Sequence, residues 1–393
     1  MRPSLFGVVP CLLIVQAAAQ TPLTFEQIQA KARPAPEQWR AEALVAERQR
    51  QLQESRGFLR DGPTLALSAG PRRIPGAPGT TDRGIEVDLP LFLSPKVRAG
   101  LSEKLGQTHP LLKEAARREG ALRLRVAYLD AWLASRMIAL SEADLATVEQ
   151  WFQASKTRFE AGADPAFQVS LVESERLKIE QYLDEARAQE ARSWGTLSAL
   201  AEVPAAPCPL ADPGPVPRIL PGDLARHMQE SPLRKALLAQ ADLEERSLRL
   251  KEAQTLSRWS LRGSFAQEGE EKVTRFGIAV RLPRLGESSA IRSSTETQIR
   301  AVQSQARQAL TELDARTAGA ISRLQRASPA SVPDFTQAIK AVGLRLQEGR
   351  ERPSEALPIR RQLLEGQMAS LRRIHAQNLL TAELQALLLE EHL

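Results

Sequence analysis

The chain has 393 residues, a formal net charge of +6 and an aromatic content of only 4%. This length suggests two or more domains, and so few aromatic residues are typical of extended helical packing rather than of a compact enzyme core. The positive charge is spread along predicted helices without a basic stripe interleaved with aromatic residues, which argues against nucleic-acid binding.

The first residues have the pattern of an export signal, which we predict over residues 1–19. Arg2 supplies a positive charge, residues 5–15 are mostly apolar, and residues 17–19 offer an Ala-rich cleavage site. A short buried helix is the alternative interpretation. No later stretch reaches about 18 consecutive apolar residues, so we expect no transmembrane helix in the mature chain. Cys208 would then be its only cysteine, which excludes an intrachain disulfide framework.

Helices are predicted before the first strand-like segment. Thr24 and Gln27 have the spacing of a capping box, and a second helix is expected from about Pro36 to Arg56. The first β-hairpin is then predicted over residues 64–92.

The motif G-I-x-V-x-L-P occurs twice, at residues 84–90 and at residues 277–283. Apolar residues alternate in it with polar or small ones, which predicts strands with two unlike faces. A second alternating run precedes each copy, so hairpins are expected at 64–92 and 259–282. In the second hairpin a short polar turn is predicted over residues 267–272. One face would carry Ile85, Val87, Leu89, Leu261, Phe265, Phe276, Ile278 and Val280. The opposite face would carry Glu86, Asp88, Arg262 and Arg281.

A coiled-coil-like seam predicts one helix over residues 95–161, about 100 Å long, with a candidate kink at Pro110. The segment from Gly162 to Pro165 reverses the chain into a helix over residues 166–200. A Pro-rich linker at 204–222 then separates a first repeat, residues 20–203, from a second one, residues 223–393.

The second repeat follows the same plan. A helix is expected from Asp223 to about Thr255, before the second hairpin. A long helix starts near Ser288, is broken by Pro329 and Pro333, and resumes to about Gln347. A reversal at 349–353 leads into a last helix to about Leu389. The matched strands and reversals are offset by about 187 to 193 positions, which predicts a tandem duplication.

Two hairpins give four strands per chain, which are too few to close a barrel. If the apolar face meets lipid, closure is required, because each unpaired backbone group in hydrocarbon costs several kcal/mol. Several chains would therefore have to pool their strands. Strands of about 8 to 10 residues suit a tilted membrane strand, and the charges on the other face indicate a water-filled interior. A small soluble sheet packed on helices is the alternative.

With the signal segment, the opening Leu23-Thr24-Phe25-Glu26, both strand motifs and both reversals in this order, the chain resembles the TolC family of bacterial outer-membrane efflux proteins. The resemblance covers essentially the whole mature chain. It implies a mainly α fold with a transmembrane β portion: a homotrimer with a twelve-stranded barrel in the outer membrane and a coiled-coil α-helical tunnel in the periplasm. It also implies a passive exit duct for substrates that an inner-membrane RND or ABC-type pump delivers through a periplasmic adaptor.

By this resemblance the reversals form the periplasmic tip that meets the adaptor, with contacts from Gly162, Asp164, Pro165, Gly349, Glu351 and Pro353. Acidic residues there, together with Glu160 and Glu348, are candidates for an entrance ring that would favour cations. Ordinary solvated loop charges are the alternative, and Asp164 is also a favoured helix N-cap. The chain departs from the family in its proline break, where the tunnel wall would bend or splay, and in its short C-terminus, which implies a reduced equatorial domain.

The sequence has no pattern of an enzyme or of a metal site. Its four histidines are scattered, and residues 76–81 lack the lysine of a phosphate-binding loop. We therefore expect no cofactor and no catalysis. The competing prediction is a soluble periplasmic coiled-coil scaffold or adaptor, which would gain nothing from two apolar hairpins. A polysaccharide-export or type I secretion outlet would differ only in its cargo, which the sequence does not identify.

Overall fold

The computed structural model describes residues 21–55, 63–72, 80–91, 95–214, 228–257, 259–268, 271–280, 286–327 and 331–388. The predicted signal segment, Asp223, Arg281 and Pro329 lie outside these ranges. The chain divides into two compact units. We call Met1–Arg33, Leu124–Pro215 and Ala330–Asn378 the hairpin unit, and Pro34–Arg123, Val216–Pro329 and Leu379–Leu393 the strand unit.

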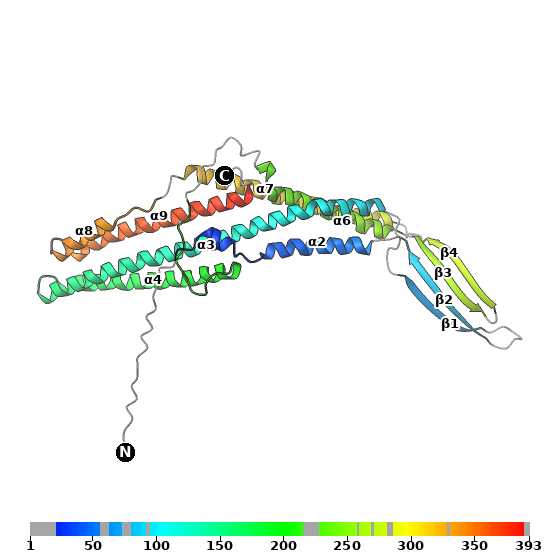
Figure 1. Cartoon of the computed structure of the whole chain (residues 1–393), viewed down its shortest axis with the longest axis horizontal. Helices are drawn as coiled ribbons and strands as arrows, with labels where there is room; N and C mark the ends of the chain where they lie inside the picture. The colour runs from blue at the N-terminus through cyan, green and yellow to red at the C-terminus, as the bar shows by residue number, and fades with distance from the viewer. Residues whose placement is uncertain are drawn as a thin grey trace, which may run out of the picture. The chain divides into compact units, whose positions relative to one another are not determined.

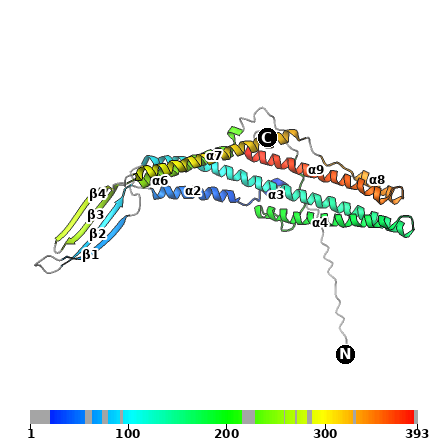
Figure 2. The same cartoon turned by 180° about the vertical axis from the view of Figure 1, so that it is seen from behind.

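The strand unit contains one antiparallel sheet in the order β1-β2-β3-β4 (Figures 1 and 2). Its strands are β1 (Thr64–Arg72), β2 (Thr80–Pro90), β3 (Trp259–Glu268) and β4 (Glu271–Val280). Both predicted hairpins are confirmed. The second is tighter than expected, because pairing continues to Glu268 opposite Glu271, where the sequence predicted a polar turn over residues 267–272.

The helices of the strand unit are α2 (Pro36–Glu54), the start of α3 (Pro95–Glu160), α6 (Pro232–Leu256), α7 (Glu287–Arg326) and the end of α9 (Pro353–Leu387). Leucines of α3 and α6 form a core with Val45 of α2; Leu101, Leu243 and Leu250 are at most 1% exposed. Burying each such side chain contributes about 1.5 to 3 kcal/mol, so this core fixes the helices that lead into and out of the sheet.

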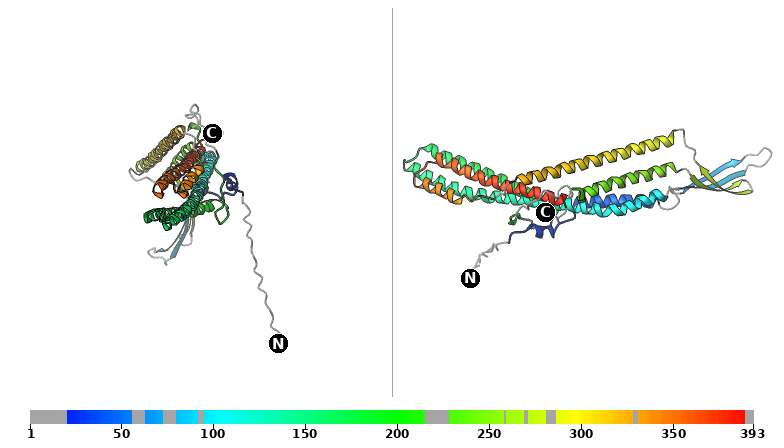
Figure 3. Two further views of the ribbon diagram at one scale, coloured as in Figure 1. Left: turned by 90° about the vertical axis from the view of Figure 1, so that its left-hand side faces the viewer. Right: turned by 90° about the horizontal axis from the view of Figure 1, so that it is seen from above.

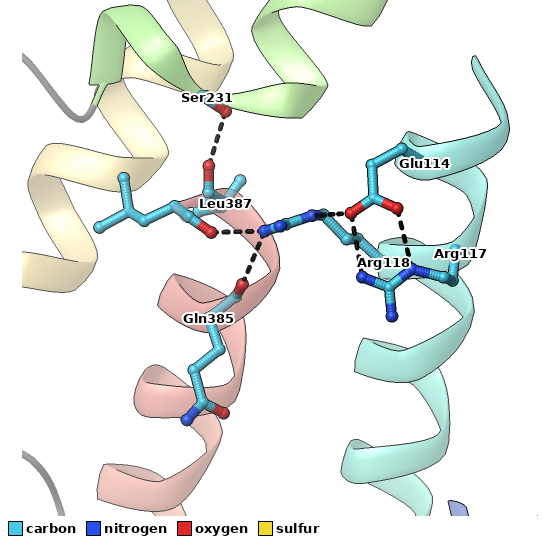
Figure 4. A network of polar contacts seen from close by, with 7 residues as sticks. Glu114, Arg117, Arg118, Ser231, Gln385 and Leu387 are labelled. Atoms are coloured by element: carbon cyan, nitrogen blue, oxygen red, sulfur yellow. Dashed lines mark hydrogen bonds and ion pairs between the residues drawn. The ribbon is translucent and has the colours of Figure 1, made fainter. Parts of the chain in front are cut away.

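The C-terminal end of α9 is held by side chains of neighbouring segments (Figure 4). Arg118 of α3 donates from Nη1 to the carbonyl oxygens of Leu388 at 2.5 Å and Gln385 at 3.4 Å. The hydroxyl of Ser231 donates to the carbonyl of Leu387 at 2.6 Å. The last carbonyls of a helix have no partner within the helix, and a cation there also offsets the helix dipole, so these contacts stabilise the end of α9.

Arg118 is itself positioned by Glu114, one turn earlier on α3 (Figure 4). Glu114 accepts from Arg118 Nε at 2.7 Å and from Arg117 at 2.9 and 3.0 Å. Hydrogen bonds from Arg117 and then Arg118 lower the pKa of Glu114 to about 2, although partial burial opposes the shift. The carboxylate thus stays ionised and keeps the Arg118 guanidinium directed at α9.

The hairpin unit contains α1 (Phe25–Gln29), the remainder of α3, α4 (Ala166–Leu200), α8 (Thr336–Gln347) and most of α9. The predicted capping box at the start of α1 is confirmed. α3 with α4, and α8 with α9, form two helical hairpins whose reversals lie at the same end of the unit (Figures 1 and 3). A core with Trp151 of α3, Val172 of α4, Leu346 of α8 and Leu357 of α9 joins the two hairpins.

The long helices follow the predicted duplication, with one difference between the repeats. α3 runs for 66 residues through Pro110, which does not end it. Its counterpart is divided into two helices, α7, which ends at Arg326, and α8, which begins at Thr336. The N–H of Thr336 donates a hydrogen bond of 2.9 Å to the carboxylate of Asp334. The predicted interruption is therefore confirmed. Among the described residues, no helix is both long and apolar enough to cross a bilayer.

Candidate functional site

The sheet has one apolar face, and the strand register assembles it from all four strands. Ile85 pairs with Phe265, and Leu89 pairs with Leu261, which in turn pairs with Ile278. The same face receives the remaining residues predicted for it, Val87, Phe276 and Val280, together with Leu65, Leu67 and Trp259.

This apolar face is uncovered in the chain. Phe276 is 82% exposed, Leu67 73% and Ile278 68%, and Ile85, Leu261 and Phe265 are each more than 40% exposed. A contiguous apolar surface of this kind marks contact with another protein or with a membrane. The alternative of a soluble sheet packed on helices through this face is wrong for the described chain.

The opposite face is charged, and its charges are organised around Arg262. Arg262 lies 2.9 Å from Glu86 and 3.5 Å from Asp88, from Nε and Nη2 respectively. The register puts all three residues on one face, as predicted. The register also places Arg275 on this face. Arg275 pairs with Ser264 and lies two residues before Gly277, the partner of Arg262. Strict alternation along β4 could have identified Arg275, whereas the predicted Arg281 lies outside the described residues.

The sheet is open at both sides. β1 is paired only with β2, and β4 only with β3, within the part of the chain that the structure describes. Each outer strand therefore presents backbone N–H and C=O groups without a strand partner, which is a template for pairing with another chain.

The first helix reversal, between α3 and α4, is built on Gly162. Its φ is +72°, in the left-handed region that favours glycine. Gly162 N–H donates to the carbonyl of Phe159 at 2.9 Å, and Ala163 N–H donates to that of Arg158 at 2.8 Å. This is a Schellman motif, which satisfies the last carbonyls of α3.

The second reversal, between α8 and α9, repeats this geometry. Gly349 has a φ of +73°, and its N–H donates to the carbonyl of Leu346 at 3.1 Å. Arg350 N–H donates to the carbonyl of Arg345 at 2.9 Å. Pro353, predicted at this tip, is buried and begins α9, where a proline costs no helical hydrogen bond.

Asp164 does not offer a free carboxylate, which corrects its interpretation as an entrance charge. Its side chain is only 3% exposed and is ion-paired with Arg158, with Nε 2.7 Å from Oδ2 and Nη2 3.0 Å from Oδ1. It is not the helix N-cap either, since that position in α4 is taken by Pro165. The charge was predicted correctly as lying at the reversal, but Arg158 neutralises it.

The other acidic residues of the reversals differ in their environment. Glu351 is paired with Arg345 at 3.2 Å and Glu348 with Arg350 at 3.0 Å, whereas Glu160 is exposed. Two further side chains tie the hairpins together, since Gln168 exchanges hydrogen bonds of 3.2 and 3.1 Å with Ser354.

Farther from the reversals, a charged cluster lies inside the hairpin unit. Arg360 of α9 is fully buried and binds Asp144 of α3 and, at 2.8 Å, Glu175 of α4; Arg361 binds Glu175 at 2.5 Å. Burial raises the pKa of Asp144 despite Arg360. Burial acts in the same direction on Glu175, but Arg361 and Arg360 outweigh it and lower its pKa. Sequence reasoning missed this cluster, which joins three helices.

No group of three or more potential metal ligands occurs among the described residues. The candidate functional features are two: a sheet with two unlike faces and open edges, and a pair of equivalent helix reversals.

No family model and no curated protein matches the sequence. Solved structures do match it. A membrane protein from Pseudomonas aeruginosa gives a TM-score of 0.65 at 18% identity, covering 92% of this chain and 90% of its own. The outer membrane protein VceC of Vibrio cholerae gives 0.63 at 15%, with 92% and 94% covered. The open state of the outer membrane channel MtrE of Neisseria gonorrhoeae gives 0.62 at 16%, with 92% and 88% covered. The chain shares their fold, which confirms the predicted fold class.

Proposed function

We propose that this chain is the subunit of a homotrimeric outer-membrane channel, a passive exit duct that extends into the periplasm of a Gram-negative bacterium. Three copies would pool their sheets into a twelve-stranded barrel, with the apolar face towards lipid and the face of Arg262 towards the lumen. The shared fold with outer-membrane channels supports this reading.

One observation carries the proposal: a sheet exposes an apolar face while it leaves both of its edges unpaired. In water such a sheet would aggregate through its edges. In a bilayer the same surface is stable only when the edges are closed, because hydrocarbon offers no hydrogen bonds to free backbone groups. Pairing β4 of one copy with β1 of the next satisfies both requirements.

The helix reversals supply the second half of the function. We infer that Gly162, Asp164, Pro165, Gly349, Glu351 and Pro353 belong to the periplasmic tip and that a periplasmic adaptor docks there. An inner-membrane pump of the RND or ABC type would deliver the cargo and the energy. The chain would act as a conduit rather than an enzyme, since its charged clusters serve structural contacts.

The competing function is a soluble periplasmic scaffold. Such a protein has no use for exposed side chains such as Phe276 and Ile278 on a sheet surface, because burying them would be favourable by about 25 cal/mol per Å². The apolar face therefore favours the channel.

Fractionation of cells that produce the full chain tests the proposal. We expect the protein in the outer membrane, extracted by detergent as a trimer, and we expect ion conductance after reconstitution into a planar bilayer. Recovery of a monomer in the soluble periplasm would refute the channel and favour the scaffold. A membrane-bound trimer without conductance would agree with the proposed location but would refute the proposed exit duct.

A further inference from the structure

The two helix reversals are equivalent by the duplication, at an offset of about 187 positions. Arg158 and Arg345 occupy the same place, third from the end of their helices, and Asp164 and Glu351 follow the two glycines at the same distance. Each arginine forms an ion pair with its acidic counterpart, Arg158 at 2.7 Å and Arg345 at 3.2 Å. The surroundings of these equivalent residues nevertheless differ.

Arg158 binds groups of both reversals within its own chain. Besides Asp164, its Nη1 donates to the carbonyl of Leu346 in the second reversal at 3.1 Å. Its guanidinium also lies against Gly349, where an added Cβ would be 2.8 Å from Nη1. The first reversal is thus attached to the second through one arginine, which binds a carbonyl and covers a glycine.

Arg345 forms the equivalent ion pair but lacks the equivalents of the other two Arg158 contacts, the one with a carbonyl and the one with a glycine. Its side chain is 64% exposed, compared with 21% for Arg158. The carbonyl equivalent to that of Leu346 belongs to Phe159; among the described residues it accepts only from Gly162 N–H. A Cβ added at Gly162 would meet nothing within 4 Å.

The side chains show the same imbalance. Leu346 is 1% exposed, whereas its counterpart Phe159 is 45% exposed. The first reversal therefore has an uncovered apolar side chain, an uncovered glycine and an available carbonyl lone pair. The second reversal has an exposed arginine that matches them.

We propose that the exposed side of each second reversal binds the first reversal of another copy of this chain. Arg345 of one copy would donate to the carbonyl of Phe159 of the next copy and would lie against its Gly162. The inference rests on the homotrimer proposed above. In a closed ring of chains with two equivalent hairpins each, every first hairpin has a second hairpin on both sides, one from its own chain and one from a neighbour.

Of the contacts that join the two reversals within a chain, only the arginine contact has an equivalent between copies. Gln168 and Ser354 bind each other within the chain, but their counterparts are Glu355 and Phe167, which cannot form that pair of hydrogen bonds. The interface between copies would therefore depend on Arg345 more strongly than the junction within a chain depends on Arg158.

Site-directed cross-linking distinguishes the two junctions. In a Cys208→Ala background, one variant carries Arg345→Cys and Ala161→Cys; its matched control carries Arg158→Cys and Glu348→Cys at the equivalent positions. Each variant is treated with a short bis-maleimide as assembled protein in membranes and run on a denaturing gel. We expect covalent dimers and trimers from the first variant, and products of monomer size only from the control.

The assembly state is measured separately by native mass spectrometry of the same samples. A trimer whose Arg345→Cys, Ala161→Cys variant gives no product larger than a monomer would overturn the proposed contact and leave the channel intact. An original chain, with Arg345 intact, that never assembles would instead refute the homotrimer, and the contact with it.

Removal of the side chain provides a second readout. Arg345→Ala should lower the temperature at which the trimer dissociates, because three contacts between copies are lost. Arg350→Ala is the control, since Arg350 is 75% exposed at the same reversal and pairs only with Glu348 among the described residues. Equal dissociation temperatures for the two variants would contradict the proposal.

Discussion

Arg360 and Asp144 lie 216 residues apart in the chain and form an ion pair in which neither side chain is more than 3% exposed. Arg360 also binds Glu175 at 2.8 Å, so one guanidinium joins α9 to α3 and α4. Charges removed from water are costly unless they are paired, and this cluster therefore holds the three helices in a fixed register.

Replacement of Arg360 tests this role. Arg360→Ala leaves Asp144 and Glu175 without their shared partner and should lower the free energy of unfolding by about 3 to 5 kcal/mol. Arg361→Ala is the control: Arg361 is 49% exposed, so its loss should cost no more than about 1 kcal/mol. Urea unfolding followed by circular dichroism measures both, and equal losses would contradict the assignment.

The contact of Glu114 with Arg117 and Arg118 predicts a dependence on pH. The pKa of Glu114 is about 2 in the folded chain and 4.5 in the reference state. Because the folded pKa is the lower one, the contribution is complete above pH 4.5 and is lost as the pH falls from 4.5 towards 2. Since the side chain is 36% exposed, we expect about 1 kcal/mol rather than the full linkage value.

Thermal unfolding of Glu114→Gln and of the original chain measures this effect. The variant should be less stable at pH 6, and the two should converge near pH 2. Glu103→Gln is the control, since Glu103 pairs with the neutral Gln107. A constant difference between Glu114→Gln and the original chain across this range would contradict the prediction.

The two reversal glycines should respond differently to substitution. Both have positive φ, so an alanine at Gly162 or Gly349 costs about 1 to 2 kcal/mol. Gly349→Ala should cost about 1 kcal/mol more, because its Cβ would collide with Arg158 and disturb a hydrogen bond. Denaturant unfolding of the detergent-dispersed monomer measures the difference. In the assembled trimer the difference should shrink, since Arg345 of another copy would then cover Gly162.

The two faces of β4 provide a test of the lipid contact. Ile278→Arg places a charge on the apolar face and should destabilise the inserted protein by about 2 to 4 kcal/mol near the bilayer midplane. Ala279→Arg is the matched control on the opposite face, next to Ser260. The measurement is the amount of folded trimer in outer-membrane fractions. Equal recovery of the two variants would reject the assigned lipid face.

Arg262 should influence the ion selectivity of the proposed lumen. Arg262→Gln removes the ion-pair partner that Glu86 and Asp88 share, so this face loses one positive charge per chain. The reversal potential in a salt gradient should shift towards cations. Arg83→Gln is the control, because Arg83 pairs with Ala69 and lies on the opposite face. A shift of equal size in the control would count against a lumen-facing Arg262.

Periodicity predicted the strands, the long helices and their order. The helix expected from Asp223 is the exception, because Ser231 is not helical and α6 begins at Pro232. Alternation with period two placed Ile85, Phe265 and Ile278 on one face, and the register confirms that they share it. Helix ends were predicted well where glycine or proline fixes the backbone, as at Gly162. The turn between β3 and β4 was predicted too long, because its polar residues are equally compatible with exposed strand ends.

Side-chain partners could not be predicted in the same way. The burial of Asp164 depends on Arg158, and the Arg360 cluster joins residues from three helices. Such pairs have no local period, since they arise when separate helices pack against one another. The sequence predicted the two reversals, but only the structure distinguishes the engaged Arg158 from the exposed Arg345.

The even number of strands in the sheet determines how a further copy of the chain can extend the sheet. Because each strand runs opposite to its neighbour, β4 is directed opposite to β1. A further copy can therefore dock its first strand on the last one without changing the alternation of directions, and the seam between copies has the same polarity as every junction within a copy. A subunit with three strands would meet its neighbour in parallel at each seam.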